Sequence, residues 1–95
     1  MPAIIGLLTI DIFIPDAGNL KDKRRVVKSL IDRLGNRHNV SVAEIEQLDN
    51  HARATLAVVH VANDRAHVER VLSHVLTTTE GERRAVVEGS YTEIF

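Results

Sequence analysis

The residues most able to do chemistry in this chain are lysines and arginines gathered in one stretch, NLKDKRRVVKSLIDRLGNR, from Asn19 to Arg37. Seven of the chain's 12 basic residues lie there against two acidic ones, which gives a local charge of +5. Ammonium and guanidinium groups at this density can contact about four to six phosphates of a structured RNA, with strongly salt-dependent binding. The residues we predict as phosphate or acidic-partner contacts are Lys21, Lys23, Arg24, Arg25 and Lys28.

The rest of the chain is acidic. Since the whole chain carries a net charge of −1, the residues outside this stretch sum to −6. A molecule whose charge is divided in this way can steer one side toward an anion. The alternative is that a solvent-exposed helix simply prefers long polar side chains, and the sequence leaves both interpretations open.

The other reactive residue types form no recognisable catalytic or metal-binding pattern. The chain has no cysteine, which excludes disulfides and thiolate chemistry. His67 and His74 share one side of a predicted helix, but two turns separate their rings by about 10 Å, too far for one metal ion. No Ser-His-Asp arrangement is recognisable. We therefore expect a non-enzymatic protein with no catalytic residue, no metal ion and no cofactor.

The basic stretch itself has the pattern of an amphipathic helix. Asn19 is a good N-cap, and Gly35 is expected to end the helix in the left-handed conformation. One face is apolar at three- and four-residue spacing, which places the basic residues on the opposite face. The apolar residues are Leu20, Val27, Leu30, Ile31 and Leu34.

The remaining patterns predict four strands and a second helix. The second strand is expected to bulge or to end early, because Ile45 breaks its alternation. Glu44 and Glu46 suit an edge of the sheet, where charge discourages pairing with other chains. The order is βαββαβ, so we predict a single ferredoxin-like α+β domain over residues 1–95, with a four-stranded antiparallel sheet and two helices on one face. The expected strands are Ile4–Ile14, His38–Leu48, Arg53–Val61 and Arg83–Ile94, and the second helix runs from Asp64 to about Leu76.

The face of the sheet without helices is expected to be apolar. Ile5, Leu7 and Phe13 of the first strand lie there, beside either Val59 and Val61 or Leu56 and Val58 of the third. Such a surface on a small domain usually marks an interface, so we predict a homodimer, or a protein-binding adaptor, that uses this face. A further alternative is a small-ligand-binding dimer similar to ACT domains, because Gly18 could present backbone N–H groups to a carboxylate.

Three stretches resemble the YlxP family of small bacterial proteins: IIGLLTIDIFIP at Ile4–Pro15, the run Asn19–Glu44, and AVVHVANDRAHVERVL at Ala57–Leu72. Members usually show Ser at the position of Asn19 and an aromatic residue at that of His38. The resemblance implies a ferredoxin-like fold. The family's gene neighbours imply a role near ribosomal RNA or a ribosomal particle, and it supplies no catalytic residue. The start MPAIIGLL lacks signal-peptide features and no apolar run could span a membrane, so we predict a cytoplasmic location.

Overall fold

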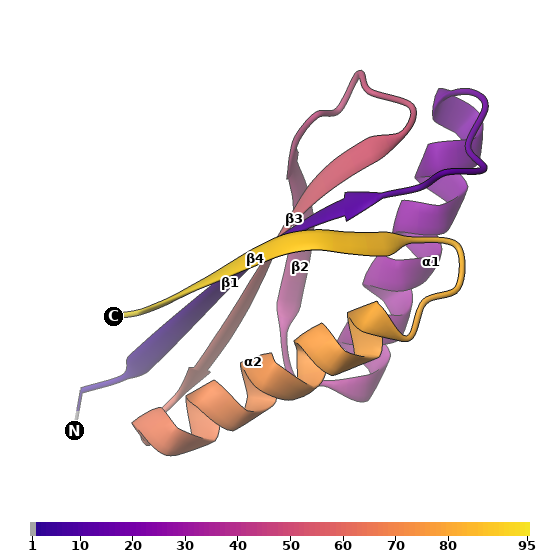
Figure 1. The fold of residues 1–95 in the computed structure, drawn as a ribbon. Coiled ribbons are helices and arrows are strands. Elements are labelled where there is room, and N and C mark those ends of the chain that lie inside the picture. Colours follow the sequence, from indigo (N-terminus) through magenta and orange to yellow (C-terminus); the bar gives the residue numbers. More distant parts are fainter. Residues whose placement is uncertain (1) are drawn as a thin grey trace.

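The fold is built around two long neighbouring strands, β1 (Ile4–Phe13) and β3 (Arg53–Ala62), which pair antiparallel along their whole length. This computed structural model describes residues 2–95. The sheet has the strand order β2-β3-β1-β4, and all neighbours are antiparallel. Figure 1 shows β4 in front, with both helices below and to the right of the sheet. The other elements are α1 (Leu20–Arg37), β2 (Ser41–Glu46), α2 (Arg65–Glu80) and β4 (Val86–Ile94). The predicted ferredoxin-like α+β fold is confirmed.

The core lies between the helices and one face of the sheet. Every second residue of β1 faces the helices, and Leu8, Ile10 and Ile12 are almost completely buried. The register decides which face of β3 joins them, because Leu56 and Val58 are fully buried. The outward-facing residues of β3 therefore include Val59 and Val61.

A close approach of α2 to β1 depends on Gly6. A Cβ atom at this position would overlap the side chains of Val68 and Leu72 on α2. Because no other residue type leaves that space, glycine is what allows the helix to lie flat against the sheet here.

The first helix begins as predicted but ends differently. Asn19 Oδ1 accepts the Asp22 N–H at 2.8 Å, which confirms the N-cap, and the Asp22 carboxylate accepts the Gly18 N–H at 3.2 Å. The expectation that Gly35 ends the helix is wrong. Gly35 lies inside α1, and no glycine in the described chain has a positive φ. The helix continues because the extended His38 donates its N–H to Leu34 O and its ring bonds the Thr78 hydroxyl of α2.

The second helix is one turn longer than predicted. It runs past Leu76 to Glu80, and Thr77, Thr78 and Thr79 fit into this last turn because their hydroxyls donate to the carbonyl groups four residues earlier. Gly81 ends it, as expected, with its N–H directed at the last turn.

The edges of the sheet follow the sequence pattern more closely. The register of β2 against β3 shifts between Glu44 and Glu46, and the strand ends at Glu46, before the predicted Leu48. The irregularity expected at Ile45 and the edge position of β2 are therefore confirmed. β4 begins at Val86 and not at Arg83, because the preceding residues form a turn that leads out of α2. Within residues 2–95 no helix has the length and apolar character needed to cross a membrane.

Candidate nucleic-acid interface

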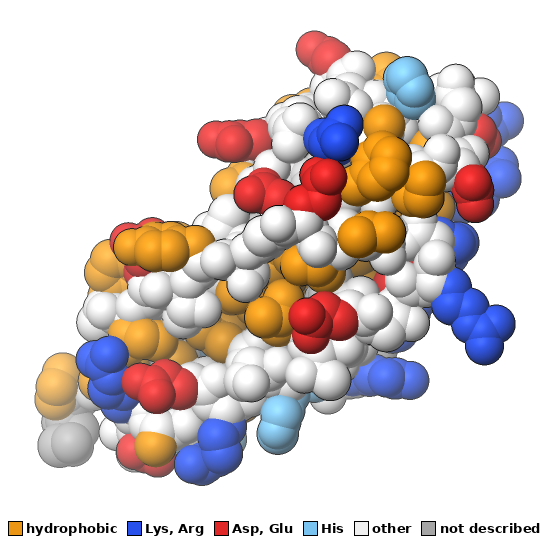
Figure 2. Space-filling model, in the orientation of Figure 1, with side chains coloured by type: hydrophobic (Ala, Val, Ile, Leu, Met, Phe, Trp, Pro, Cys, Tyr) orange, Lys and Arg blue, Asp and Glu red, His pale blue; other side chains and the backbone are white. Residues whose placement is uncertain are grey.

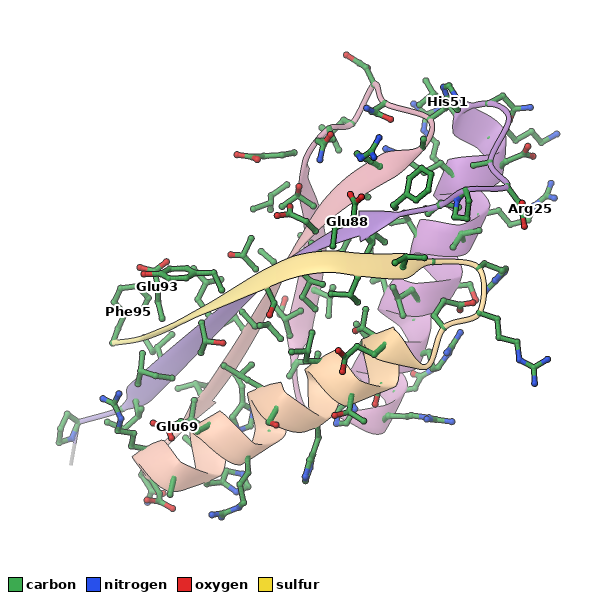
Figure 3. All side chains as sticks on the ribbon, in the orientation of Figure 1. Arg25, His51, Glu69, Glu88, Glu93 and Phe95 are labelled. Atoms are coloured by element: carbon green, nitrogen blue, oxygen red, sulfur yellow. The ribbon has the colours of Figure 1, made fainter. Side chains whose placement is uncertain are left out.

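The outer face of α1 is a cationic surface. Four of the five predicted contacts are exposed there, and Figure 3 shows Arg25 directed away from the sheet. Figure 2 shows Lys and Arg side chains along the margin where α1 runs. Lys28 Nζ lies 2.9 Å from Asp32 Oδ2, but both side chains are well exposed and such pairs are weak. We call this cationic outer surface of α1 the basic face. The predicted contacts that lie on it are Lys21, Arg24, Arg25 and Lys28.

Lys23 does not belong to the basic face. Its side chain is 0% exposed, and its Nζ donates to Glu44 Oε2 at 2.7 Å and to the carbonyl oxygen of Gln47 at 2.9 Å. The carbonyl oxygen of Arg53 lies 3.3 Å from the same nitrogen. The prediction that Lys23 contacts a phosphate is wrong, because its three donors are used inside the protein.

The signal for this burial was present in the sequence. Lys23 stands four residues before Val27 and seven before Leu30, so it lies on the apolar face of the helix and not on the outer one. The number of charges in the stretch does not show on which face of the helix each charged residue lies.

A shallow hollow of about 570 Å³ lies along the outer side of α1. It is open to solvent, and it offers four cations, one carboxylate and two neutral polar side chains. A guanidinium fork matches the oxygens of a phosphate, and hydroxyl and amide groups can add hydrogen bonds to a phosphate or a sugar. The lining residues are Arg25, Lys28, Ser29, Asp32, Arg33, Asn36 and Arg37.

The rim of this hollow is fixed by a buried carboxylate from the segment after α2. Glu82 is 5% exposed and forms ion pairs with Arg33 of α1 and with Arg84. Its hydrogen bonds from Arg84, against the opposing effect of burial and with help from Arg33, lower the pKa of Glu82 to about 2. Arg84 also donates to Ser29 Oγ at 3.1 Å.

This carboxylate clamp determines which cations of the site are free to bind a ligand. The charges of Arg33 and Arg84 are partly neutralised, so the cations of α1 that have no ion pair in the described chain are the ones most available to a ligand. Sequence reasoning missed Glu82 and Arg84, because the contact joins segments about half the chain apart and has no local pattern.

The histidines form pairs that the sequence did not predict. His60 and His67 have ring centroids 5.3 Å apart, and His60 Nδ1 lies 2.7 Å from Asn39 O. Burial, His74 and Arg37 lower the pKa of His38. Across residues 2–95, no three His, Asp or Glu side chains are grouped so that they could hold a metal ion.

The open face of the sheet is partly apolar. Of the three predicted interface residues, Ile5 is 42% exposed, whereas Leu7 and Phe13 are half-buried. The Arg53 guanidinium lies 4.7 Å from the centre of the Phe13 ring and covers it. Nothing in a single chain tests whether this face forms an oligomer, so that expectation stays a prediction.

The turn before α1 already has a carboxylate at the position where a ligand carboxylate would bind. The Gly18 N–H is occupied by the Asp22 side chain, which also lies beside the N-terminal end of the helix. The geometry of this turn is that of an internal helix cap.

Comparisons with known proteins give a family and a fold. The family model described as protein of unknown function (DUF503) matches residues 5–91. The chain is 37% identical over 73 residues to the uncharacterized protein YlxP of Bacillus subtilis (strain 168), which covers 77% of this chain and 79% of that protein. The de novo designed protein Foldit4 has a TM-score of 0.52 to this structure at 13% identity, over 99% of this chain and 97% of that chain. That likeness shows the fold alone.

Proposed function

Since the chain belongs to the DUF503 family, whose description assigns no activity, we propose a function from the surface itself: a non-enzymatic accessory protein that docks on RNA through the basic face of α1. The ligand is the phosphate backbone of ribosomal RNA or of a ribonucleoprotein in the cytoplasm. The observation that carries this proposal is the concentration of exposed cations, including Arg24 and Arg25, on one side of a chain whose net charge is −1.

The geometry favours backbone contacts over base recognition. The basic face carries no aromatic side chain, and the aromatics of the chain, Phe13, Tyr91 and Phe95, lie on or beyond the sheet strands. Stacking on aromatics is the usual way to read unpaired bases, so an RNA held by α1 would be held by its phosphates. Binding would then be salt-dependent and tolerant of sequence.

Charge reversal on the basic face tests the proposal. We use Arg24→Glu/Arg25→Glu, because both side chains are exposed and acidic residues near a helix N-terminus do not weaken the helix. The variant should lose association with ribosomal particles in a low-salt sedimentation assay. Lys23 is left unchanged, because its replacement would disturb the fold.

The matched control is Arg65→Glu/Arg70→Glu on α2, which changes the net charge by the same amount from another exposed surface. It should sediment with the particles as the unchanged protein does. Equal sedimentation of both variants, or no association of the unchanged protein, would exclude docking through α1.

A ligand-sensing role similar to that of ACT domains has less support, because the Gly18 N–H that would hold a ligand carboxylate is used by Asp22. Thermal-shift measurements against amino acids check this alternative directly. A rise in melting temperature with one amino acid would favour the sensing role over RNA docking.

A further inference from the structure

The two edges of the sheet differ in how well they are protected against pairing with another strand. β2 is six residues long, its register breaks at Ile45, and it carries two glutamates. β4 is nine residues long and also carries two glutamates, and its register with β1 shifts at Glu88, between Val87 and Gly89. From Gly89 to Ile94, however, it pairs regularly with β1 and carries one charged side chain, Glu93. Sheets usually blunt an exposed edge by charge, bulges or shortness, so the stretch of β4 from Gly89 to Ile94 is the edge segment open to a further strand.

The register with β1 shows which backbone groups of β4 are available. Ile5 and Phe95 exchange both bonds, with N···O distances of 3.1 and 2.8 Å. Because such doubly bonded pairs alternate along an antiparallel ladder, Glu93 and Tyr91 also direct their backbone groups at β1. The residues whose N–H and C=O groups point away from the sheet are Ser90, Thr92 and Ile94.

Two large aromatic side chains accompany this edge. Tyr91 and Phe95 are each 65% exposed, and Figure 3 places Phe95 beside Glu93 at the free end of β4. Figure 2 shows hydrophobic side chains gathered in the same region. Since an aromatic side chain can bury about 150–250 Å², the two rings expose about 250 Å² per copy, roughly a third of the 800 Å² or so that each partner buries in a standard interface.

We propose that β4 pairs antiparallel with β4 of a second copy, with a twofold axis beside Tyr91. In this register the regular stretch from Gly89 to Glu93 pairs with the same stretch of the other copy and stops short of the irregularity at Glu88. The outward groups of Ser90 meet those of Thr92 in the other copy, as the alternation of the ladder requires. Two copies then form one eight-stranded sheet through a self-complementary interface.

Charge and side-chain size select this register. With the axis beside Tyr91, Glu93 of each copy lies opposite Gly89 of the other, which has no side chain to collide with. An axis beside Glu93 would instead place two glutamates directly opposite each other, which is unfavourable. The two Tyr91 rings meet at a position without backbone bonds, where the strands approach most closely.

This pairing does not depend on the proposed RNA docking. The helix α1 contacts β2, at the opposite edge of the sheet from β4. In the dimer the two basic faces therefore lie toward the outer edges of the joined sheet, and both remain exposed.

The oligomeric state tests the edge separately from the open face. The unchanged protein should show a mass twice the 10.6 kDa of one chain in analytical ultracentrifugation as its concentration is raised. Thr92→Pro removes a donor that points outward and leaves the bonds to β1, so it should be monomeric and folded. Val61→Glu, on the open face, should remain dimeric. A monomeric unchanged protein overturns the proposal, as does a dimeric Thr92→Pro or a monomeric Val61→Glu.

The register is tested by crosslinking, which is simple here because the chain has no cysteine. Tyr91→Cys places two thiols across the axis, where the Cα atoms of facing residues lie about 4.5 Å apart, within the range of a disulfide. Mild oxidation should convert it to a covalent dimer even if Thr92→Pro proves unstable. Glu93→Cys is the control, because its two copies lie four residues apart along the strand, about 14 Å, and should stay uncrosslinked. Crosslinking of Glu93→Cys, or none of Tyr91→Cys, contradicts the proposed register.

Discussion

Replacing Lys23 with methionine should destabilise the protein strongly, although lysine is ordinarily a surface residue. The substitution keeps an unbranched stem of similar length in the core and removes only the buried ammonium. It leaves Glu44 without its ion partner and the carbonyl groups of Gln47 and Arg53 without this donor. The substitution therefore removes the buried ionic contact between α1 and the β2–β3 hairpin without creating a large cavity.

The size of the effect follows from burial. Removing one partner of a buried ion pair costs about 3–5 kcal/mol, because the other charge stays in a poorly solvated site. The Glu44 side chain is 15% exposed, so water can reach it in part and the lower end of that range applies. We expect a loss of about 3 kcal/mol in the free energy of unfolding, which for a domain of this size lowers the melting temperature by about 12–24 °C.

Urea unfolding followed by circular dichroism measures this loss. Lys21→Met on the same helix is the control, because Lys21 is exposed and its replacement should change the free energy by less than about 0.5 kcal/mol. If Lys23→Met is as stable as Lys21→Met, the buried ammonium does not hold α1 to the hairpin, and Lys23 returns to the candidate docking residues.

Two further predictions concern the ion pairs at the edge of the site and the packing of glycines in the fold. Glu82→Gln should remove up to about 3 kcal/mol of stability near neutral pH. The pKa of Glu82 in the folded protein, about 2, lies below its ordinary value of 4.5. The stabilisation is therefore complete above pH 4.5 and is lost as the pH falls toward 2. In acid unfolding curves, the stabilities of the unchanged protein and of Glu82→Gln should converge at that pH. Gly6→Ala should cost about 1–3 kcal/mol in urea unfolding by overpacking α2 against β1, whereas Gly35→Ala, with no atom within 4 Å of the added Cβ, should stabilise α1 by about 0.5–1 kcal/mol. Equal effects of the two glycine substitutions would contradict the packing described here.

The fold could be predicted because local patterns and long-range order agree. Alternation in β1, the three-and-four spacing of α1 and the cap at Asn19 each specify one element, and the βαββαβ order leaves few topologies. The irregularity at Ile45 was also visible, since a break in alternation indicates a bulge or an early strand end at that residue.

The details that could not be predicted depend on contacts between distant segments. Glycine commonly ends helices, yet α1 continues past Gly35, where Leu34 is buried and the His38 ring bonds the Thr78 hydroxyl. The clamp of Glu82 on Arg33 joins a turn to a helix that only the folded sheet brings together. Neither contact has a sequence signature.

Four of the five residues predicted for the candidate site lie on one exposed surface, and the placement of the fifth was wrong. Lys21, Arg24, Arg25 and Lys28 lie on the basic face, because charged side chains opposite the apolar face of a helix stay in contact with solvent. Lys23 was misplaced because its charge was considered before its position on the helical wheel. The structure thus replaces a count of charges with a defined surface.

The salt dependence of RNA binding tests the central claim most directly. The association constant of the purified protein for a structured ribosomal RNA fragment is measured across a series of salt concentrations. The logarithm of the constant should fall linearly with the logarithm of the salt concentration, and Arg24→Glu/Arg25→Glu should bind more weakly with a slope shallower by about two. Arg65→Glu/Arg70→Glu should keep the original slope. An unchanged slope in Arg24→Glu/Arg25→Glu, or no RNA binding by the unchanged protein at low salt, would contradict docking through α1.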